Sequence, residues 1–318
     1  MKRILLPVED KQFAETQIDF LAAQEFAKDA EFWLMTVVKP LSLQDFGYKI
    51  PRAYFETLIQ EDRKIAHNFL DELEQKVKGV FRKATIHKVV EYGDPSTEIL
   101  NRSKEIKPDL IVLSSHGRTG LDKVFLGSVA QAVCNRANAS VTIIKPTDTE
   151  AKFEKLKVLI PIDEKKFAEE QISFLKHHIL PANAEIVLMN VVPTLRVYDY
   201  GACIPPSYFE ELEQVEERYM ATLMDFCEKK IGEHFPNIKI HREKVYGDPK
   251  GEILHFAEAE SVQWIIIGSH GRSGFDRFFM GSVSQAVCSR AKCTVSVIRP
   301  GIEVQDAAQK EDAEVAKV

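Results

Sequence analysis

The feature that most constrains this chain is an internal duplication with an offset of 154 residues. The offset holds without gaps over almost the whole sequence and relates, for example, Gly117 to Gly271. Further matched pairs are Pro7 with Pro161, Gly93 with Gly247 and Gly127 with Gly281. Repeats of solenoid proteins are about 20 to 50 residues long, so copies of this length are domains. The sequence therefore predicts two tandem domains, over residues 1–147 and 154–300.

Composition places the chain among ordinary globular proteins. Its 318 residues are 45% hydrophobic and 28% charged, which suits two domains that each bury a core. The net charge of −6 provides no overall basic field for nucleic acid or an anionic membrane, so a phosphate site has to be local. No apolar run is as long as a membrane span and no signal peptide is evident, which predicts a cytoplasmic protein. The five cysteines are expected as reduced thiols, with Cys134 and Cys288 in the core.

Within each copy, short apolar runs alternate with longer helical patterns. In the first copy, strands are expected at 4–8, 32–38, 85–90, 110–113 and 141–144, with a helix in each intervening stretch. This alternation predicts a doubly wound parallel sheet with helices on both faces, in the α/β class. Ligands bind such sheets outside the carboxyl ends of the strands, near the point where the strand order reverses.

A glycine pattern follows the fourth predicted strand of each copy. In the second copy it reads Gly268-x-x-Gly271, nine further residues, and then Gly281-Ser282. The matching positions of the first copy are Ser114, Gly117, Gly127 and Ser128. Glycines let backbone N–H groups approach an anion, and the next helix presents unpaired N–H groups at its positive end. The pattern predicts a phosphate site, in which Ser282 either caps the helix or donates its hydroxyl to a phosphate.

Together with Pro161-x-Asp163 at the end of a strand and the Gly247-x-Pro249 turn, this pattern resembles the universal stress protein family. The resemblance covers residues 1–300, twice over, and points to the tandem type of that family. It implies a five-stranded parallel sheet with strand order 3-2-1-4-5 in each domain. It also implies a stress-response regulatory protein that binds ATP or another adenine nucleotide.

The resemblance implies a role for individual residues in the second domain. In ATP-binding members the adenosine lies near the first-strand Asp and after the second strand, so Asp163 would contact the ribose and Val191 or Val192 would line the adenine pocket. The expected nucleotide-binding residues are Pro161, Asp163, Val191, Val192, Gly268, Gly271, Arg272, Gly281, Ser282 and Val283. If a metal is bound, it is expected to be Mg²⁺ carried by the nucleotide.

The first copy departs from the family pattern at two positions, Glu9 in place of Asp and Ser114 in place of glycine. Glu9 can still reach a ribose hydroxyl. Ser114 adds a side chain where the backbone should approach the ligand, and it would be strained if its φ were positive. Nucleotide binding is therefore expected in the second domain, and the first is interpreted as a degenerate second site. Its candidate residues are Pro7, Glu9, Ser114, Gly117, Gly127 and Ser128.

The histidines and arginines of the two glycine loops have alternative interpretations. His116 and His270 have no evident carboxylate partner in the sequence, so we interpret them as turn residues rather than as acid or base groups. Arg118 and Arg272 either neutralise phosphate or are solvated, and neither interpretation is preferred. No catalytic residue is expected.

Four aspartates are interpreted as structural or solvated. Asp94 and Asp248 stand in Gly-Asp-Pro, where an Asp that caps the following helix explains the pattern. Asp122 and Asp276 are expected to be solvated, with Mg²⁺ binding as the minor alternative. The aromatic residues of the second loop are expected to pack in a core or between domains rather than to stack on a base. These residues are Phe275, Phe278 and Phe279.

The ends of the two copies carry predictions about association. The last strands, 139–145 and 293–299, contain little charge and would favour aggregation as open edges. We expect them to pair, either domain with domain inside the chain or chain with chain, and family members also pair through the fifth strand. The charged segment 301–318 has few large apolar residues and is expected to be a mobile tail, with a frayed helix as the alternative.

Three functions are compared. The first is a regulatory protein that binds ATP and hydrolyses it slowly at most. The nucleotide would order the glycine loop, and a protein partner would then bind the changed surface. The alternative is an interaction scaffold of the same fold that is independent of nucleotide. A dedicated ATP hydrolase or ligase is disfavoured, because the chain lacks a Gly-x-x-x-x-Gly-Lys-Ser/Thr loop and an evident activated nucleophile.

Overall fold

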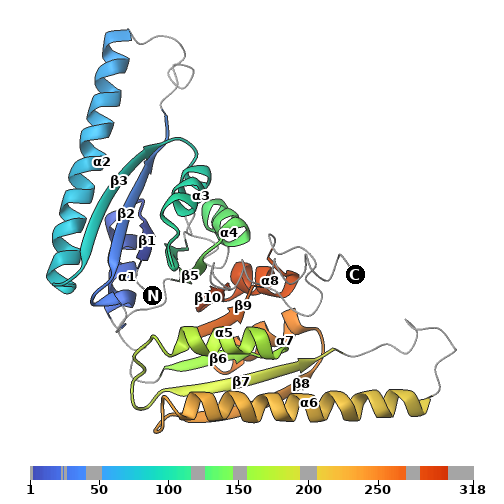
Figure 1. The fold of residues 1–318 in the computed structure, drawn as a ribbon. Coiled ribbons are helices and arrows are strands. Elements are labelled where there is room, and N and C mark those ends of the chain that lie inside the picture. Colours follow the sequence, from blue (N-terminus) through green and yellow to red (C-terminus); the bar gives the residue numbers. More distant parts are fainter. Residues whose placement is uncertain are drawn as a thin grey trace, which may run out of the picture. The chain divides into compact units, whose positions relative to one another are not determined.

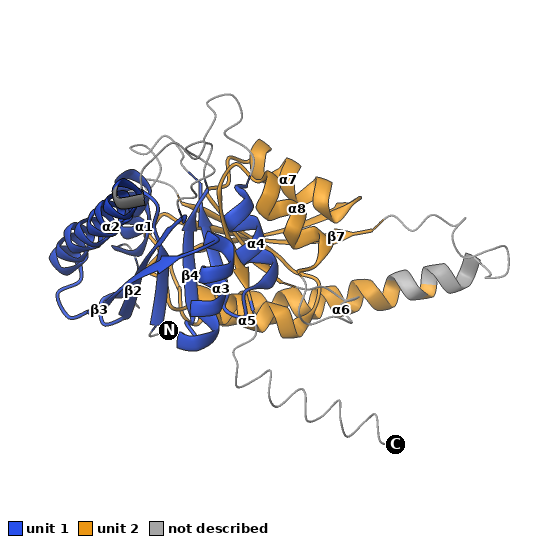
Figure 2. Cartoon of the chain, turned by 90° about the horizontal axis from the view of Figure 1, so that it is seen from above, with its two compact units in different colours: residues 1–146, 299–318 blue, residues 147–298 orange. Residues whose placement is uncertain are grey.

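The computed structural model describes residues 3–22, 24, 27–40, 52–115, 126–145, 156–193, 206–269 and 280–299. The chain divides into two compact units, residues 1–146 with 299–318 and residues 147–298, here called domain 1 and domain 2 (Figure 2). Several predicted features lie outside the described residues. They are both glycine loops (116–125 and 270–279), the segment between the copies (147–155) and the expected tail (301–318).

Domain 1 has the predicted alternation of strands and helices (Figure 1). Its elements are β1 (Arg3–Pro7), α1 (Lys11–Ala22), β2 (Glu31–Val38), α2 (Arg52–Val80), β3 (Thr85–Tyr92), α3 (Pro95–Ile106), β4 (Leu110–Ser114), α4 (Ser128–Arg136) and β5 (Ser140–Ile144). All neighbouring strands are parallel, in the order β3-β2-β1-β4-β5. The strand order implied by the family resemblance is therefore confirmed.

Domain 2 repeats this topology. Its elements are β6 (Lys157–Pro161), α5 (Lys165–Leu175), β7 (Glu185–Val192), α6 (Pro206–Gly232), β8 (Lys239–Tyr246), α7 (Pro249–Ala259), β9 (Trp264–Gly268), α8 (Ser282–Arg290) and β10 (Thr294–Ile298). Its strands are ordered β8-β7-β6-β9-β10 and are again parallel. In each domain the first two helices pack against each other on one face of the sheet, and the last two pack on the opposite face.

The core lies around the central strands and thins towards β3 and β8. Every residue of β4 and β9 is buried, as expected for apolar runs covered by helices on both faces. In contrast, most residues of β8 are exposed, and charged side chains such as Arg242 and Lys244 occupy this outer strand. Charge on an edge strand disfavours pairing with another chain. None of the described helices is long and apolar enough to cross a membrane.

The central pair of strands in each domain separates towards its carboxyl end. The register of β6 with β9 runs only through Val158 with Trp264 and Leu159 with Ile265, whereas β6 pairs with β7 over its full length. The pairing of β1 with β4 in domain 1 is equally short. The strand order reverses here, because β6 continues to β7 on one side and β9 to β10 on the other. The separation opens a crevice at the place where doubly wound sheets bind ligands.

Candidate functional site

The crevice of domain 2 is a cavity of about 290 Å³, which we call the central cavity of domain 2. It lies at the carboxyl ends of β6, β7 and β9 and is closed by the first residues of α7 and α8 and by α6. Its lining residues are Pro161, Ile162, Asp163, Gln171, Met189, Asn190, Val191, Pro193, Glu216, Pro249, Ile253, Ile267, Gly268, Gly281, Ser282, Val283 and Ser284. Segments about 120 residues apart in the sequence thus meet at one wall.

Most of the residues expected from the sequence line this cavity. They are Pro161, Asp163, Val191, Gly268, Gly281, Ser282 and Val283. Of the two valines considered for the adenine pocket, Val191 lines the central cavity and Val192 lines a different one. Gly271 and Arg272 lie outside the described residues.

Domain 1 has a matching cavity of about 310 Å³, the central cavity of domain 1. The candidate residues Pro7, Glu9, Ser114, Gly127 and Ser128 all line it, and Gly117 lies outside the described residues. The other lining residues are Val8, Phe13, Gln17, Met35, Val37, Lys39, Pro95, Ile99, Leu113, Val129 and Ala130. The substitutions that suggested a degenerate copy have therefore not filled the crevice.

The backbone strain considered for Ser114 is not present. Ser114 is the last residue of β4, and among the described non-glycine residues only Lys107 and Ser261 have positive φ. The Ser114 hydroxyl donates a hydrogen bond of 3.3 Å to the carbonyl oxygen of Phe13 in α1. The side chain is thus accommodated against the helix, which corrects the strain argument from the sequence.

A pair of buried glutamines at the strand ends was missed by the sequence analysis. Gln171 is 2% exposed, and its side-chain Nε2 donates to the carbonyl oxygens of Pro161 and Ile266, at 3.1 Å each. Gln17 makes the same two bonds in domain 1, at 3.1 and 3.2 Å. These carbonyl groups lie where the two central strands separate and no longer form hydrogen bonds with each other. The sequence feature that could have identified them is a glutamine on the otherwise apolar face of the first helix in both copies.

The start of α8 has no side-chain cap among the described residues. Its N-cap is Gly281, which has no side chain to cap the helix, and Ser282 is the first helical residue. The capping role considered for Ser282 is therefore not observed. The Ser284 hydroxyl donates to the carbonyl oxygen of Gly268 at 2.6 Å, and the Gly281 N–H donates to that of Ser269 at 2.7 Å. These bonds hold the helix start beside the end of β9, so its N–H groups face the crevice as in phosphate-binding sites.

The caps of α3 and α7 agree with the sequence interpretation. The Asp94 carboxylate accepts from the backbone N–H of Thr97 at 2.9 Å, and Asp248 accepts from that of Gly251 at 3.2 Å. Asp94 also accepts from the Ser96 hydroxyl at 2.6 Å, and these bonds lower its pKa to about 2. Both helices then begin at prolines that line the central cavities, so the caps help to position the cavity walls.

The charged side chains that line the two central cavities differ. Domain 2 presents two carboxylates, Asp163 and Glu216, whereas domain 1 presents Glu9 and the ammonium group of Lys39. Proline replaces this lysine in domain 2, at position 193. A phosphate-bearing ligand would therefore meet more negative charge among the described lining residues of domain 2 than of domain 1.

A second cavity of about 370 Å³ lies beneath α6, and we call it the lateral cavity. Its lining residues are Asn190, Val192, Glu216, Glu217, Met220, Ala221, Met224, Arg242, Glu243, Lys244 and Tyr246. It shares Asn190 and Glu216 with the central cavity of domain 2. It was not predicted from the sequence, because its floor comes from β7 and β8 and its roof from α6, and the packing of this helix over the two strands has no local motif.

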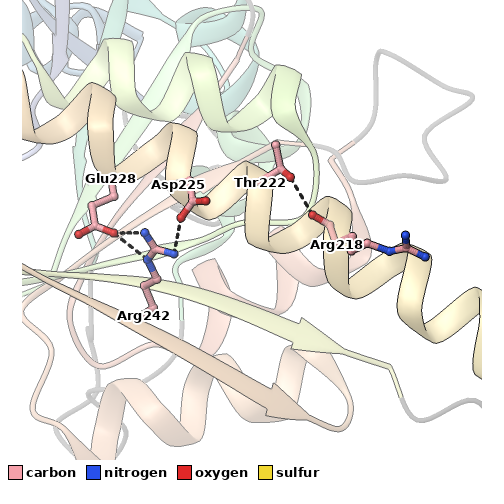
Figure 3. A network of polar contacts seen from close by, with 5 residues as sticks. All are labelled: Arg218, Thr222, Asp225, Glu228 and Arg242. Carbon is pink, nitrogen blue, oxygen red and sulfur yellow. Dashed lines mark hydrogen bonds and ion pairs between the residues drawn. The ribbon is translucent and has the colours of Figure 1, made fainter.

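Ion pairs join α6 to β8 alongside the lateral cavity. Figure 3 shows Arg242 of β8 between Asp225 and Glu228 of α6, with a hydrogen bond of 2.7 Å to each carboxylate. The Lys244 ammonium is paired in the same way with Glu217, at 2.5 Å. Nearer the start of α6, the Thr222 hydroxyl donates a hydrogen bond of 2.8 Å to the carbonyl oxygen of Arg218 (Figure 3). Exposed pairs contribute little stability singly, but here they hold the helix over the strand.

The remaining candidate residues are only partly described. Cys134 and Cys288 are buried, as expected, and so are Cys227 and Cys293. Within the described ranges, no group of three or more His, Cys, Asp or Glu residues is placed to hold a metal ion. Residues of the glycine loops lie outside the described part of the chain, namely His116, Arg118, Asp122, His270, Asp276, Phe275, Phe278 and Phe279.

Comparisons with known proteins agree with the fold and the repeat. The sequence model of the universal stress protein family matches residues 1–145 and 156–299. A universal stress protein of Mycolicibacterium smegmatis is 25% identical over 303 residues, which are 93% of this chain and 97% of that protein. One from Mycobacterium tuberculosis is 27% identical over 256 residues, 78% of this chain and 82% of its own length.

Solved structures have the same fold over nearly the whole chain. A universal stress protein from Archaeoglobus fulgidus matches with a TM-score of 0.60 and 22% identity, over 95% of this chain and 97% of that one. A protein from Pseudomonas aeruginosa, described as a putative universal stress protein, matches with a TM-score of 0.58 and 18% identity, over 95% and 94%. At these identities the likeness concerns the fold.

Proposed function

The chain belongs to the universal stress protein family, whose members are stress-response proteins, and we propose that its domain 2 binds an adenine nucleotide, ATP in the first instance. The observation that carries this proposal is the central cavity of domain 2. It brings Asp163 from the first strand, Val191 from the second and the start of α8 to one wall. These three places are where the family resemblance expects ribose, adenine and phosphates.

Each part of the cavity suits one part of the ligand. A carboxylate such as Asp163 accepts hydrogen bonds from ribose hydroxyls, and the apolar side chains of Val191 and Ile253 contact a base through its faces. The phosphates take the unpaired N–H groups after Gly281 and the hydroxyl of Ser282. The remaining phosphate contacts of the proposal are assigned to Gly271 and Arg272, which lie between β9 and α8 in the sequence.

The charge of the lining favours a nucleotide that carries its own cation. Asp163 and Glu216 would repel a free triphosphate, and Mg²⁺ bound to the phosphates reduces that repulsion. Carboxylate and phosphate oxygens are the ligands that Mg²⁺ takes in proteins. We therefore propose the magnesium complex of ATP as the bound form. Binding rather than turnover carries the proposed role, with the nucleotide ordering the glycine loop for a protein partner.

Calorimetric titration of the full chain with ATP, with and without Mg²⁺, tests this proposal. Asp163→Ala should abolish most binding, while the matched change Glu9→Ala in domain 1 should leave it nearly unchanged. Thermal unfolding of both variants without ligand reports whether the fold survives. The alternative scaffold function predicts no ATP binding even by the unmutated chain. Equal loss in both variants would mean that domain 1 is at least an equal site.

The association surface expected from the sequence also remains a proposal. β5 and β10 each end the strand order within their own domain, and their sequences, Ser140–Ile144 and Thr294–Ile298, carry no charged residue. An edge of this composition is stabilised by pairing with another strand. Light scattering of the full chain, together with an Ile143→Lys variant, would test whether such pairing lies within one chain or joins two chains.

A further inference from the structure

Asn190 occupies the wall between the two cavities of domain 2. It lies in β7, is 6% exposed, and lines both the central and the lateral cavity. Its side-chain Nδ2 donates a hydrogen bond of 3.1 Å to the carbonyl oxygen of Ile162. The N–H of Ile162 donates to the carbonyl oxygen of Met189 at 2.8 Å, so β7 binds both backbone groups of Ile162, the residue directly before Asp163.

The bond to Ile162 determines which end of the amide is left for a ligand. A carbonyl oxygen can only accept, so the atom facing Ile162 has to be the NH₂ group and the other atom has to be Oδ1. Among the described residues, nothing donates a hydrogen bond to this buried oxygen. A buried acceptor without a partner is costly, and a ligand that supplies a donor removes that cost.

The side chain therefore distinguishes ligands by their hydrogen-bonding groups. Adenine carries an exocyclic amino group, which donates, at the position where guanine and hypoxanthine carry an oxygen, which only accepts. An oxygen placed against Oδ1 would leave two acceptors facing each other without a proton between them. Rotating the amide would not relieve this, because Oδ1 would then face the carbonyl of Ile162.

The equivalent position in domain 1 lacks this discrimination. It is Thr36, whose hydroxyl can both donate and accept and can rotate to suit either kind of ligand. Thr36 is also buried, but unlike Asn190 it is not among the residues that line the central cavity of its domain.

We propose that Asn190 is the residue that selects the base, with its Oδ1 accepting a hydrogen bond from the amino group of adenine and rejecting 6-oxopurines. This inference rests on the proposed nucleotide site and adds to it the residue that reads the purine. It also predicts that selection is a property of domain 2.

The test compares ATP with inosine triphosphate, which has an oxygen in place of the amino group, by calorimetric titration of the full chain with Mg²⁺. The unmutated protein should bind ATP about tenfold more tightly or better, as expected for one mismatched buried hydrogen bond. Asn190→Thr should bring the two affinities within about threefold, while Thr36→Asn in domain 1 should leave the preference of the high-affinity site unchanged.

The ratio of the two affinities separates base selection from a structural role. If Asn190 only anchored Ile162, Asn190→Thr would weaken both nucleotides by the same factor and keep their ratio, which would overturn the inference. Equal binding of both nucleotides by the unmutated chain would overturn it without any variant. Failure of both nucleotides to bind would instead contradict the proposed function. Asn190→Ser serves as a second variant if thermal unfolding shows that the threonine is not tolerated.

Discussion

Gln171 is tied to Pro161 by a hydrogen bond of 3.1 Å from its side-chain amide to the proline carbonyl oxygen, and the same amide also reaches Ile266. One buried side chain thus closes the gap where β6 and β9 stop pairing. Gln17 does the same in domain 1. Where the crevice opens, the carbonyl groups of the two strands no longer pair with each other. A glutamine of the first helix donates the hydrogen bonds that they would otherwise lack.

We expect Gln17→Leu to destabilise the chain by about 1–3 kcal/mol, because two buried carbonyl groups lose their donor. The loss is partly offset, since the Oε1 atom of Gln17 has no partner among the described residues and is removed as well. Urea unfolding measures the change. Gln12→Leu, an exposed position on the same helix, is the matched control and should cost well under 1 kcal/mol. Similar costs for the two variants would contradict the role of Gln17.

Gly247 should not tolerate a side chain. Its φ is +155°, and a Cβ at this position would lie 2.7 Å from Oε1 and 2.9 Å from Cγ of Glu252. Gly247→Ala should therefore destabilise domain 2 by about 1–3 kcal/mol. In Gly251→Ala the new Cβ would be 3.8 Å from the nearest atom, an ordinary contact inside a helix, so this control should be neutral or slightly stabilising. Thermal unfolding of both variants provides the comparison.

The cap of α3 should make stability depend on pH in the acid range. Hydrogen bonds from Ser96 and Thr97 lower the pKa of Asp94 from 3.8 to about 2. Because the folded-state pKa is the lower one, the contribution is complete above pH 3.8 and is lost as the pH falls towards 2. In Asp94→Asn this part of the acid dependence should disappear. Melting temperatures measured between pH 2 and 5 test the prediction, and an unchanged slope would refute it.

The ionisation of Glu170 should have the opposite effect on stability as the pH rises. Burial raises its pKa from 4.5 to about 7, although the charge of Lys166 opposes the shift. The folded state holds the proton more tightly, so stability decreases as the pH rises from 4.5 to about 7. Glu170→Gln should remove this decrease and stabilise the chain at neutral pH by on the order of 1 kcal/mol, a figure reduced for solvent screening of the partly exposed carboxyl group.

The experiment for Glu170 is a series of urea unfolding curves from pH 4 to 8 for both proteins. The two curves of stability against pH should converge at the acid end and diverge towards neutrality. Glu169→Gln, at the neighbouring exposed position on α5, is the matched control and should leave the curve of stability against pH nearly unchanged. Parallel curves for the unmutated chain and Glu170→Gln would contradict a raised pKa.

The duplication, the order of strands and helices, and the position of the glycine pattern all follow from the amino-acid sequence. These features are periodic or local, because apolar spacing reports burial and a repeat reports a shared fold. The caps Asp94 and Asp248 were predictable for the same reason, since a cap bonds to a backbone group three residues away.

Which side chains meet in the crevice depends on tertiary packing. Val191 lines the central cavity and Val192 the lateral one, and nothing local in the sequence tells which residues of β7 border which cavity. Glu216 and Asn190 enter the site from a helix and a strand that are distant in the chain from the glycine pattern. Ser114 likewise turned out to be held by Phe13 rather than strained. Contacts between distant segments depend on how the elements pack, which no local pattern encodes.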